Sequence, residues 1–349
     1  MNIRNQRTMP ANRVHHCMTS VCEFVIIYGG CENNTGAVCN ELLSFNTISG
    51  IWKHHYPPIE IKDTCLSSSI CSVGNLVYIF GGDCFDDHQY RQTNSIVSFD
   101  ITNSTWNVVY PHTNNYDPNT PPPMCCNYLL YNNGSLYVFG DTIYRFCLKS
   151  LTWFLMPQNG LKPTYNRQIF GTVYKNRIYC FEPPQAEKTR FKDIFIFDLS
   201  TLIWTSRSMS SRDKQYPDDR HYESWAFSGN VGFMSGGIRP YTTYKINSDI
   251  WRIDLECVEW RKLENSLNPS VYDHSMAVID DSYLYSFGGY HNECWINTLE
   301  RFTVQPPTLY RLCLESICQS PNLRNYTKIL PAAIADELNF NGNNSSLDQ

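Results

Sequence analysis

Hydrophobic and polar residues alternate in short runs that end in glycine, and this arrangement recurs along most of the chain. Runs of about four to eight residues with a period of two predict β-strands. The recurring strands are FVIIYGG (24–30), LVYIFGG (76–82), LYVFGD (136–141), FMSGG (233–237) and YLYSFGG (283–289). One further copy, RIYCFEPP (177–184), has prolines in place of the glycines.

A second pattern places an apolar strand and a short turn before a tryptophan. It occurs at LLSFNTISGIW (42–52), IVSFDITNSTW (96–106), IYRFCLKSLTW (143–153), IFIFDLSTLIW (194–204) and IWRIDLECVEW (250–260). The period is about fifty residues, which is typical of propellers and other repeat arrays. With one strand before the glycines and one starting at the tryptophan, each unit holds about four antiparallel strands, as a propeller blade does.

The residue types also suit blades packed in a ring. Glycine lets backbones approach closely near a central channel, and tryptophan fills the space between neighbouring blades. A single blade cannot bury both of its faces, so we expect the units to close into a ring of about six over residues 13–305. The sixth unit ends in LERFTV (299–304) without a tryptophan. Its outer strand is therefore in question, and N-terminal residues are candidates to close the ring.

The chain ends differently, in a segment with helical periodicity. In TLYRLCLESI (308–317) the apolar residues recur at helical spacing and predict one helical face. Ser320 and Pro321 then match a helix cap and first position, and Pro331 is placed to open a third helix. We therefore expect an N-terminal segment (1–12), an all-β propeller (13–305), a short helical docking segment (306–340) and a polar, disordered tail (341–349).

The repeat resembles the kelch repeat, and the C-terminal segment resembles two docking motifs of ubiquitin-ligase receptors. The pattern L-x-x-x-C-x-x-x-Φ is similar to the elongin C-binding box, and we expect that contact from Leu309, Leu312, Cys313 and Ile317. The pattern Φ-P-x-x-Φ-x-x-x-L is similar to the cullin-2 box of von Hippel–Lindau-type receptors, and it comprises Leu330, Pro331, Ile334 and Leu338. Both fit helix-in-groove recognition. The alternative is a helical cap that packs on the propeller rim.

A kelch propeller followed by these motifs resembles the kelch-type substrate receptors of cullin-2 RING ubiquitin ligases. The resemblance is carried by NNGSLYVFG (132–140), DDRHYESWAFSGNVGFMSGG (218–237), PYTTYKIN (240–247) and SVYDHSMAVIDDSYLYSFGG (270–289). It implies elongin B, elongin C and cullin-2 as partners, and protein C-termini, several of them ending in glycine, as ligands. It also implies a non-catalytic adaptor, and the lack of an export signal together with the scattered cysteines favours the cytoplasm or the nucleus.

Binding a chain end requires a cation beside a shaped, partly apolar pit. We expect these groups at the starts of the inner strands and in the loop after the glycine pair Gly236–Gly237. The candidate residues are Arg239, Tyr241, Tyr244, Arg220, Arg167, Tyr272 and His274. Arg239 is the strongest candidate because aromatic residues follow it in its loop. For each arginine, the alternative is an ion pair at the surface or between blades.

Composition narrows the remaining classes of function. A net charge of −5 argues against a nucleic-acid-binding surface. No apolar run approaches the roughly 20 residues of a membrane span, and the first residues do not form a signal peptide. The 15 cysteines lack zinc-ligand spacing and favour reduced thiols.

Catalytic motifs are absent from the sequence, including HExxH, GxSxG, GxGxxG and the sialidase signature. We therefore expect no catalytic residue, metal or cofactor. A kelch scaffold in cytoskeletal or stress-signalling complexes is the alternative to a ligase receptor. A propeller enzyme would need an acid or metal cluster that the sequence does not display.

Overall fold

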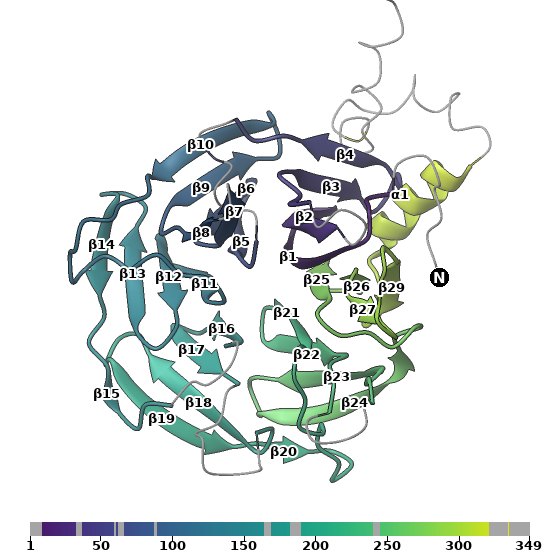
Figure 1. Cartoon of the computed structure of the whole chain (residues 1–349). Coiled ribbons are helices and arrows are strands. Elements are labelled where there is room, and N and C mark those ends of the chain that lie inside the picture. Colours follow the sequence, from purple (N-terminus) through teal and green to yellow (C-terminus); the bar gives the residue numbers. More distant parts are fainter. Residues whose placement is uncertain are drawn as a thin grey trace, which may run out of the picture.

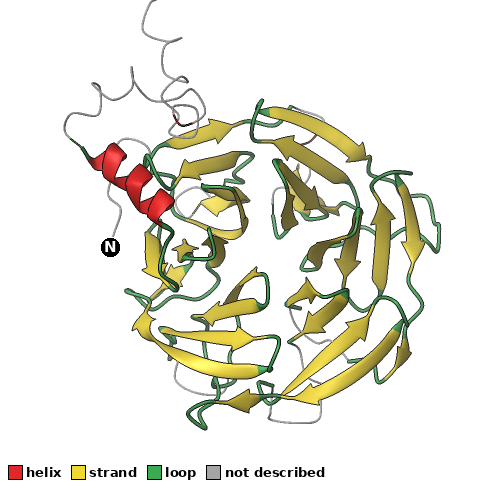
Figure 2. Ribbon diagram, turned by 180° about the vertical axis from the view of Figure 1, so that it is seen from behind, coloured by secondary structure: helices red, strands yellow, loops and turns green. Residues whose placement is uncertain are grey.

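A computed structural model describes residues 9–32, 37–58, 61, 66–86, 89–163, 169–181, 190–239, 245–320 and 334. Its strands form small antiparallel sheets that radiate from a central opening (Figure 1). The prediction of a six-bladed propeller followed by a C-terminal helix is confirmed. The same ring seen from behind shows α1 (Leu309–Gln319) at the outer rim (Figure 2).

The first three blades each contain four antiparallel strands. Blade 1 comprises β1 (Arg13–Val21), β2 (Phe24–Glu32), β3 (Leu42–Asn46) and β4 (Trp52–His55). Blade 2 comprises β5 (Ser69–Val73), β6 (Leu76–Phe80), β9 (Ile96–Asp100) and β10 (Thr105–Tyr110), with the hairpin β7 (Asp83–Asp86) and β8 (Gln89–Gln92) inserted. Blade 3 comprises β11 (Tyr128–Asn132), β12 (Ser135–Phe139), β13 (Ile143–Cys147) and β14 (Thr152–Leu155).

The next two blades add a short parallel strand at their outer edge. Blade 4 comprises β16 (Gly171–Tyr174), β17 (Arg177–Cys180), β18 (Asp193–Asp198) and β19 (Ile203–Ser208), with β15 (Asn159–Gly160) beside β19. Blade 5 comprises β21 (Ser224–Ser228), β22 (Val231–Ser235), β23 (Asp249–Asp254) and β24 (Glu259–Ser266), with β20 (Ser210–Ser211) beside β24. Each short strand follows the last strand of one blade in sequence and pairs with the outer strand of the next blade, so it connects neighbouring blades.

The sixth blade has three main strands, in agreement with its missing tryptophan. It comprises β25 (Ser275–Ile279), β26 (Tyr283–Phe287) and β29 (Leu299–Thr303), with the hairpin β27 (Tyr290–His291) and β28 (Cys294–Trp295). The described N-terminal residues, from 9 onward, do not supply a fourth strand, because β1 belongs to blade 1. They still close the ring, since Gly289 N donates to Arg13 O (3.3 Å) and Asn12 Nδ2 donates to Trp295 O (3.2 Å).

The tryptophans pack against the preceding blade, as the sequence predicted. In each case one partner is an aromatic ring just before the glycine position of that blade. Examples are Trp106 with Tyr28 (ring centroids 6.0 Å apart) and Trp153 with Phe80 (5.7 Å). Blade 5 has Ser235 at this position, and the blade that follows lacks the tryptophan. The one blade without an aromatic ring at this position is therefore followed by the one blade without the tryptophan.

The glycine pairs allow the close approach near the channel. Gly236 has φ +66°, and a Cβ on it would lie 2.4 Å from the carbonyl oxygen of Val271 in blade 6. Gly237 has φ +88°, and its Cβ would lie 2.8 Å from His221 O of its own blade. The first glycine therefore allows two neighbouring blades to approach closely, and the second allows the backbone to pass close to the first strand of its own blade. Among the described residues, no helix has the length and hydropathy of a membrane span.

Candidate functional site

Helix α1 is fixed to the propeller by a buried arginine. Thr308 caps the helix by accepting a hydrogen bond from Arg311 N (3.2 Å). The Arg311 guanidinium is 3% exposed and donates to Asp280 Oδ2 (2.7 Å) and to Glu315 Oε1 (2.9 Å). It also donates to Thr47 Oγ1 (2.8 Å) and Thr47 O (3.1 Å) in blade 1. The guanidinium therefore joins the helix to the first and the last blade.

The opposite face of α1 carries exposed apolar side chains. Leu309 is 81% exposed and Leu312 is 42% exposed, while Cys313 is also exposed. The helix contacts the propeller through Arg311 and Leu314 instead. The helix therefore does pack on the propeller rim, as the alternative expects, but it leaves Leu309, Leu312 and Cys313 exposed.

Ile317 does not fully share that exposed face. It is partly buried against Leu314 and Ile48. With about 3.6 residues per turn, position 317 is rotated by about 80° from Leu309, toward the propeller side. Our assignment of Ile317 to the same free face is therefore corrected: it borders both surfaces.

The second docking motif is only partly described. Ile334 packs against the same small cluster of Ile48 and Leu314. Leu330, Pro331 and Leu338 lie outside the described residues, so the predicted cullin-binding face stays a prediction.

The second candidate site is a pocket at one end of the central channel, with a volume of about 350 Å³. Its rim includes five residues with a left-handed backbone conformation, which come from blades 1, 2, 3, 5 and 6. They are His15, Ser67, Cys126, Tyr222 and Asp273. Backbone bonds join neighbours in this ring, such as Ser67 N to His15 O (3.0 Å) and Asp273 N to Tyr222 O (2.8 Å). The left-handed turns thus link the blades and line the pocket.

Two histidines in the wall of this pocket are buried and uncharged. Burial lowers the pKa of His16 and that of His274 to about 3. His274 Nε2 lies 2.9 Å from Ser235 Oγ, and His16 Nε2 donates to Phe287 O (3.2 Å). His274 therefore lines the pocket as the sequence suggested, but it supplies no positive charge at neutral pH.

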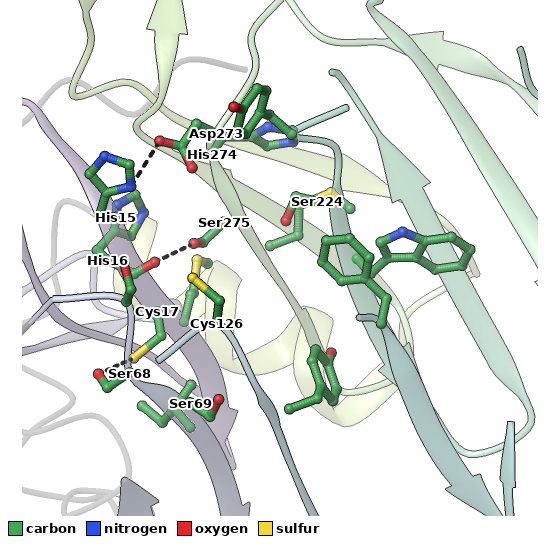
Figure 3. A pocket seen from close by; sticks show the side chains of 18 of the residues that line it. His15, His16, Cys17, Ser68, Ser69, Cys126, Ser224, Asp273, His274 and Ser275 are labelled. Atoms are coloured by element: carbon green, nitrogen blue, oxygen red, sulfur yellow. Dashed lines mark hydrogen bonds and ion pairs between the residues drawn. The ribbon is translucent and has the colours of Figure 1, made fainter. Parts of the chain in front are cut away.

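Asp273 and His15 form a pair at the pocket rim that the sequence analysis missed. Asp273 Oδ2 lies 3.3 Å from His15 Nδ1, and Figure 3 shows the two side chains turned toward each other. Burial raises the pKa of Asp273 to about 6, and His15 partly offsets this rise. Aligning the repeats along the first strand of each blade places His15 and Asp273 at equivalent positions, and this alignment would have found both residues.

Arg220 is structural, which corrects its assignment as a ligand-binding cation. Its side chain is fully buried. It forms a two-pronged ion pair with Asp249 (2.7 and 3.3 Å) and donates to Gly236 O (3.1 Å). Arg13 makes the equivalent bonds to Glu41 and Gly29 O in blade 1. An arginine in this position fastens its own blade.

Arg239 is better placed for a ligand. Its side chain is 34% exposed, and it bonds to Asp218 and to Asn247 Oδ1 (3.3 Å). It follows the glycine pair of blade 5, at the same end of that blade as Tyr222 of the pocket rim. Arg239 itself does not line the pocket.

The other candidates divide into two groups. Tyr272 is half-buried and stacks on Tyr290, with ring centroids 4.9 Å apart. Arg167, Tyr241 and Tyr244 lie outside the described residues. No group of three or more His, Cys, Asp or Glu side chains with metal-site geometry occurs in the part of the chain that the structure describes.

Comparison with known proteins agrees with this architecture. The chain is 24% identical over 370 residues to Kelch domain-containing protein 10 of Mus musculus, covering 96% of this chain and 81% of that protein. It is 23% identical over 358 residues to the Homo sapiens protein of the same name, covering 93% and 78%. It is 22% identical over 371 residues to Homo sapiens Kelch domain-containing protein 1, covering 93% and 89%.

A family model also matches most of the propeller. The model for the KLHDC2/KLHL20/DRC7 Kelch-repeats domain matches residues 1–141 and 67–289. These ranges reach from blade 1 to the glycine pair of blade 6, so sequence family and observed fold coincide. The chain belongs to the KLHDC2/KLHL20/DRC7 Kelch-repeats domain family.

Proposed function

We propose that the chain is the substrate-recognition subunit of a cullin-2–elongin B/C ubiquitin ligase. In this role α1 docks onto elongin C, and the propeller face binds protein C-termini, including ends in glycine. The chain acts as a non-catalytic adaptor. The observation that carries the proposal is the exposed face of Leu309, Leu312 and Cys313 on a helix that is itself firmly fixed to the propeller.

The exposed face supports a helix-in-groove contact. Leu309 leaves most of its apolar surface in water, although the helix has a buried side that Arg311 and Leu314 already occupy. An uncovered apolar stripe on an anchored helix marks an interaction surface. The exposed Cys313 beside Leu309 allows a partner backbone to approach closely.

The expected cullin-2 contact belongs to the same proposal. Leu330, Pro331, Ile334 and Leu338 would form a second face after α1, so the two partners would contact consecutive segments. Ile334 packs near Ile48 beside α1, which supports a position close to the elongin-binding face. Replacing Leu330 and Pro331 by alanine should weaken cullin-2 recruitment while elongin binding persists.

Co-purification tests the docking claim. Elongin B and elongin C should co-purify with the tagged wild-type chain and not with Leu309→Asp, because docking would bury an unpaired carboxylate. Leu151→Asp is a matched control, because Leu151 is 51% exposed in the turn before β14. It should retain both elongins. Undiminished elongin binding by Leu309→Asp would exclude this face and favour the scaffold alternative.

Peptide binding tests the substrate claim. Peptides that end in glycine should bind more tightly as free acids than as amides, because the amide lacks the charge that an arginine recognises. The Arg239→Ala variant should lose this difference. Equal affinity for acid and amide would exclude recognition of the chain end at this face.

A further inference from the structure

The pocket at the channel mouth has an acidic rather than a basic lining. Its described lining residues include the carboxylates Glu223 and Asp273, and they include no lysine or arginine. A carboxylate ligand would therefore meet like charge inside the pocket. Arg239, the cation considered above for chain ends, lies at the same end of blade 5 and is not part of the lining.

Glu223 and Asp273 differ in whether a buried cation already neutralises their charge. Glu223 pairs with Arg190, and both side chains are buried, at 1% and 5% exposure. Arg190 also donates to Arg220 O (2.7 Å), which holds it in the blade. Asp273, in contrast, keeps 20% of its side chain exposed and faces His15, which is 48% exposed. Asp273 is therefore the carboxylate that a ligand can reach.

The surroundings of Asp273 suit a cation. Tyr222 precedes it in the rim, is 56% exposed, and accepts the Asp273 backbone N–H at its carbonyl oxygen (2.8 Å). The ring of Tyr272 lies 6.3 Å from that of Tyr222. An exposed aromatic ring beside a carboxylate, here that of Tyr222, attracts ammonium and guanidinium groups.

We infer that this pocket binds a positively charged side chain, a lysine ammonium or an arginine guanidinium, of a protein ligand. Asp273 supplies the counter-charge, and Tyr222 and His15 flank the bound group. This inference rests on the proposed function only in taking the propeller face as the substrate-binding face. It adds a subsite distinct from Arg239, where the proposal places the chain end.

The size and the wall of the pocket agree with this occupant. A volume of about 350 Å³ lies at the lower end of the range for small-ligand sites and admits a side chain rather than a folded surface. The hydroxyls of Ser69, Ser224 and Ser275 line the wall. His16 and His274 stay uncharged at neutral pH, so they do not repel a cation.

Binding should depend on pH with a defined sign. Because burial raises the pKa of Asp273 to about 6, its carboxylate is ionised above that pH and protonated below it. A cation should bind more weakly as the pH falls from 7.5 to 5. His15 also faces Asp273, with 3.3 Å between Nδ1 and Oδ2. The other titratable groups that surround Asp273 are Cys31, Cys126, Tyr222, His274 and Tyr290.

The test uses N-acetylated, fluorescently labelled Ser/Gly decapeptides that end in glycine. One of the last six positions carries lysine, Nε-acetyl-lysine or glutamate, and every peptide is made as acid and as amide. At a preferred position, lysine should bind the full-length protein about tenfold or more tightly than acetyl-lysine. A free N-terminus in the acetyl-lysine peptide should not restore binding, which separates a side-chain site from a site for chain starts.

Two variants test whether Asp273 itself, rather than the overall negative charge of the protein, produces the preference for lysine. Asp273→Asn keeps the size of the side chain and should abolish the preference for lysine. Asp219→Asn, at an exposed carboxylate in the loop before β21, should keep it. Melting temperatures of the variants check that each is folded, and the wild-type preference at pH 5 gives a second measurement without mutation.

The outcomes also separate this inference from the proposed function. If acids bind better than amides but lysine and acetyl-lysine bind equally, the cation subsite is overturned and chain-end recognition stands. If lysine is preferred but acid and amide bind equally, the subsite stands and chain-end recognition fails. Failure of all peptides to bind overturns the subsite, and so does a lysine preference that persists in Asp273→Asn.

Discussion

Arg311 in α1 donates two hydrogen bonds to Thr47 in the turn after β3, although 264 residues separate them in sequence. The same guanidinium bonds to Asp280, in the turn between β25 and β26 of the last blade. It also lies over the ring of Tyr283, 5.2 Å from the centroid. One side chain therefore connects the docking helix with both blades at the closure of the ring.

Replacing Arg311 by methionine should release α1 from the rim. The variant keeps much of the side-chain volume but removes a buried charge, leaving Asp280 and Thr47 without this partner. We expect a loss of about 3 kcal/mol in the free energy of unfolding, in line with breaking buried ionic networks. Urea denaturation measures this loss, and limited proteolysis near Thr308 should become faster.

The exposed Arg261 provides the matched control. Arg261→Met should leave both readouts close to wild type. Slow proteolysis and unchanged stability of Arg311→Met would show that the helix is held by Leu314 and its neighbours rather than by the arginine.

Substitution by alanine should destabilise the protein by different amounts at two glycines that have similar φ angles, Gly236 and Gly229. A Cβ on Gly236 would lie 2.4 Å from Val271 O, whereas a Cβ on Gly229 would meet nothing within 4 Å. Both have positive φ, so each substitution costs about 1 kcal/mol of backbone strain. Gly236→Ala adds a clash between blades, and we expect a total loss of about 2–4 kcal/mol.

Thermal or urea unfolding of the two variants side by side measures the difference. Equal destabilisation would mean that the fifth and sixth blades separate easily, and that the glycine is needed only for its φ.

The buried His274 should make stability depend on pH. Its folded pKa is about 3, below the unfolded value of about 6.5, so the unfolded chain binds a proton that the folded protein does not. This contribution to stability is complete above pH 6.5 and is lost as the pH falls. Between the two pKa values, one such group lowers the free energy of unfolding by about 1.4 kcal/mol for each pH unit of acidification.

His274→Asn removes that group, so the difference in stability between wild type and variant should shrink as the pH falls from 6.5 to 4.5. Ser235→Ala is the control, because it removes the contact with His274 Nε2 but keeps the imidazole. Its effect should vary little with pH. A constant gap between wild type and His274→Asn over this range would show that His274 does not carry the dependence.

The sequence determined the blades because the features that build them are local. Strand alternation, the glycine pairs and the tryptophans each act within one repeat or between neighbouring repeats, so periodicity alone exposes them. The missing tryptophan of the sixth unit even marked the blade whose main sheet has three strands among the described residues. The apolar spacing of Leu309, Leu312 and Cys313 likewise predicted one shared helical face.

Tertiary structure decided which surfaces are left for partners. Arg220 looked like a ligand-binding cation in sequence, but Asp249 and Gly236 O bury it within its own blade. Asp273 and His15 meet only because the ring closes, and no local pattern links residues so far apart. The exposed side of α1 was likewise settled by Arg311, whose partners lie in the first and last blades. A charge or an apolar face becomes available to a ligand only when the fold leaves it exposed.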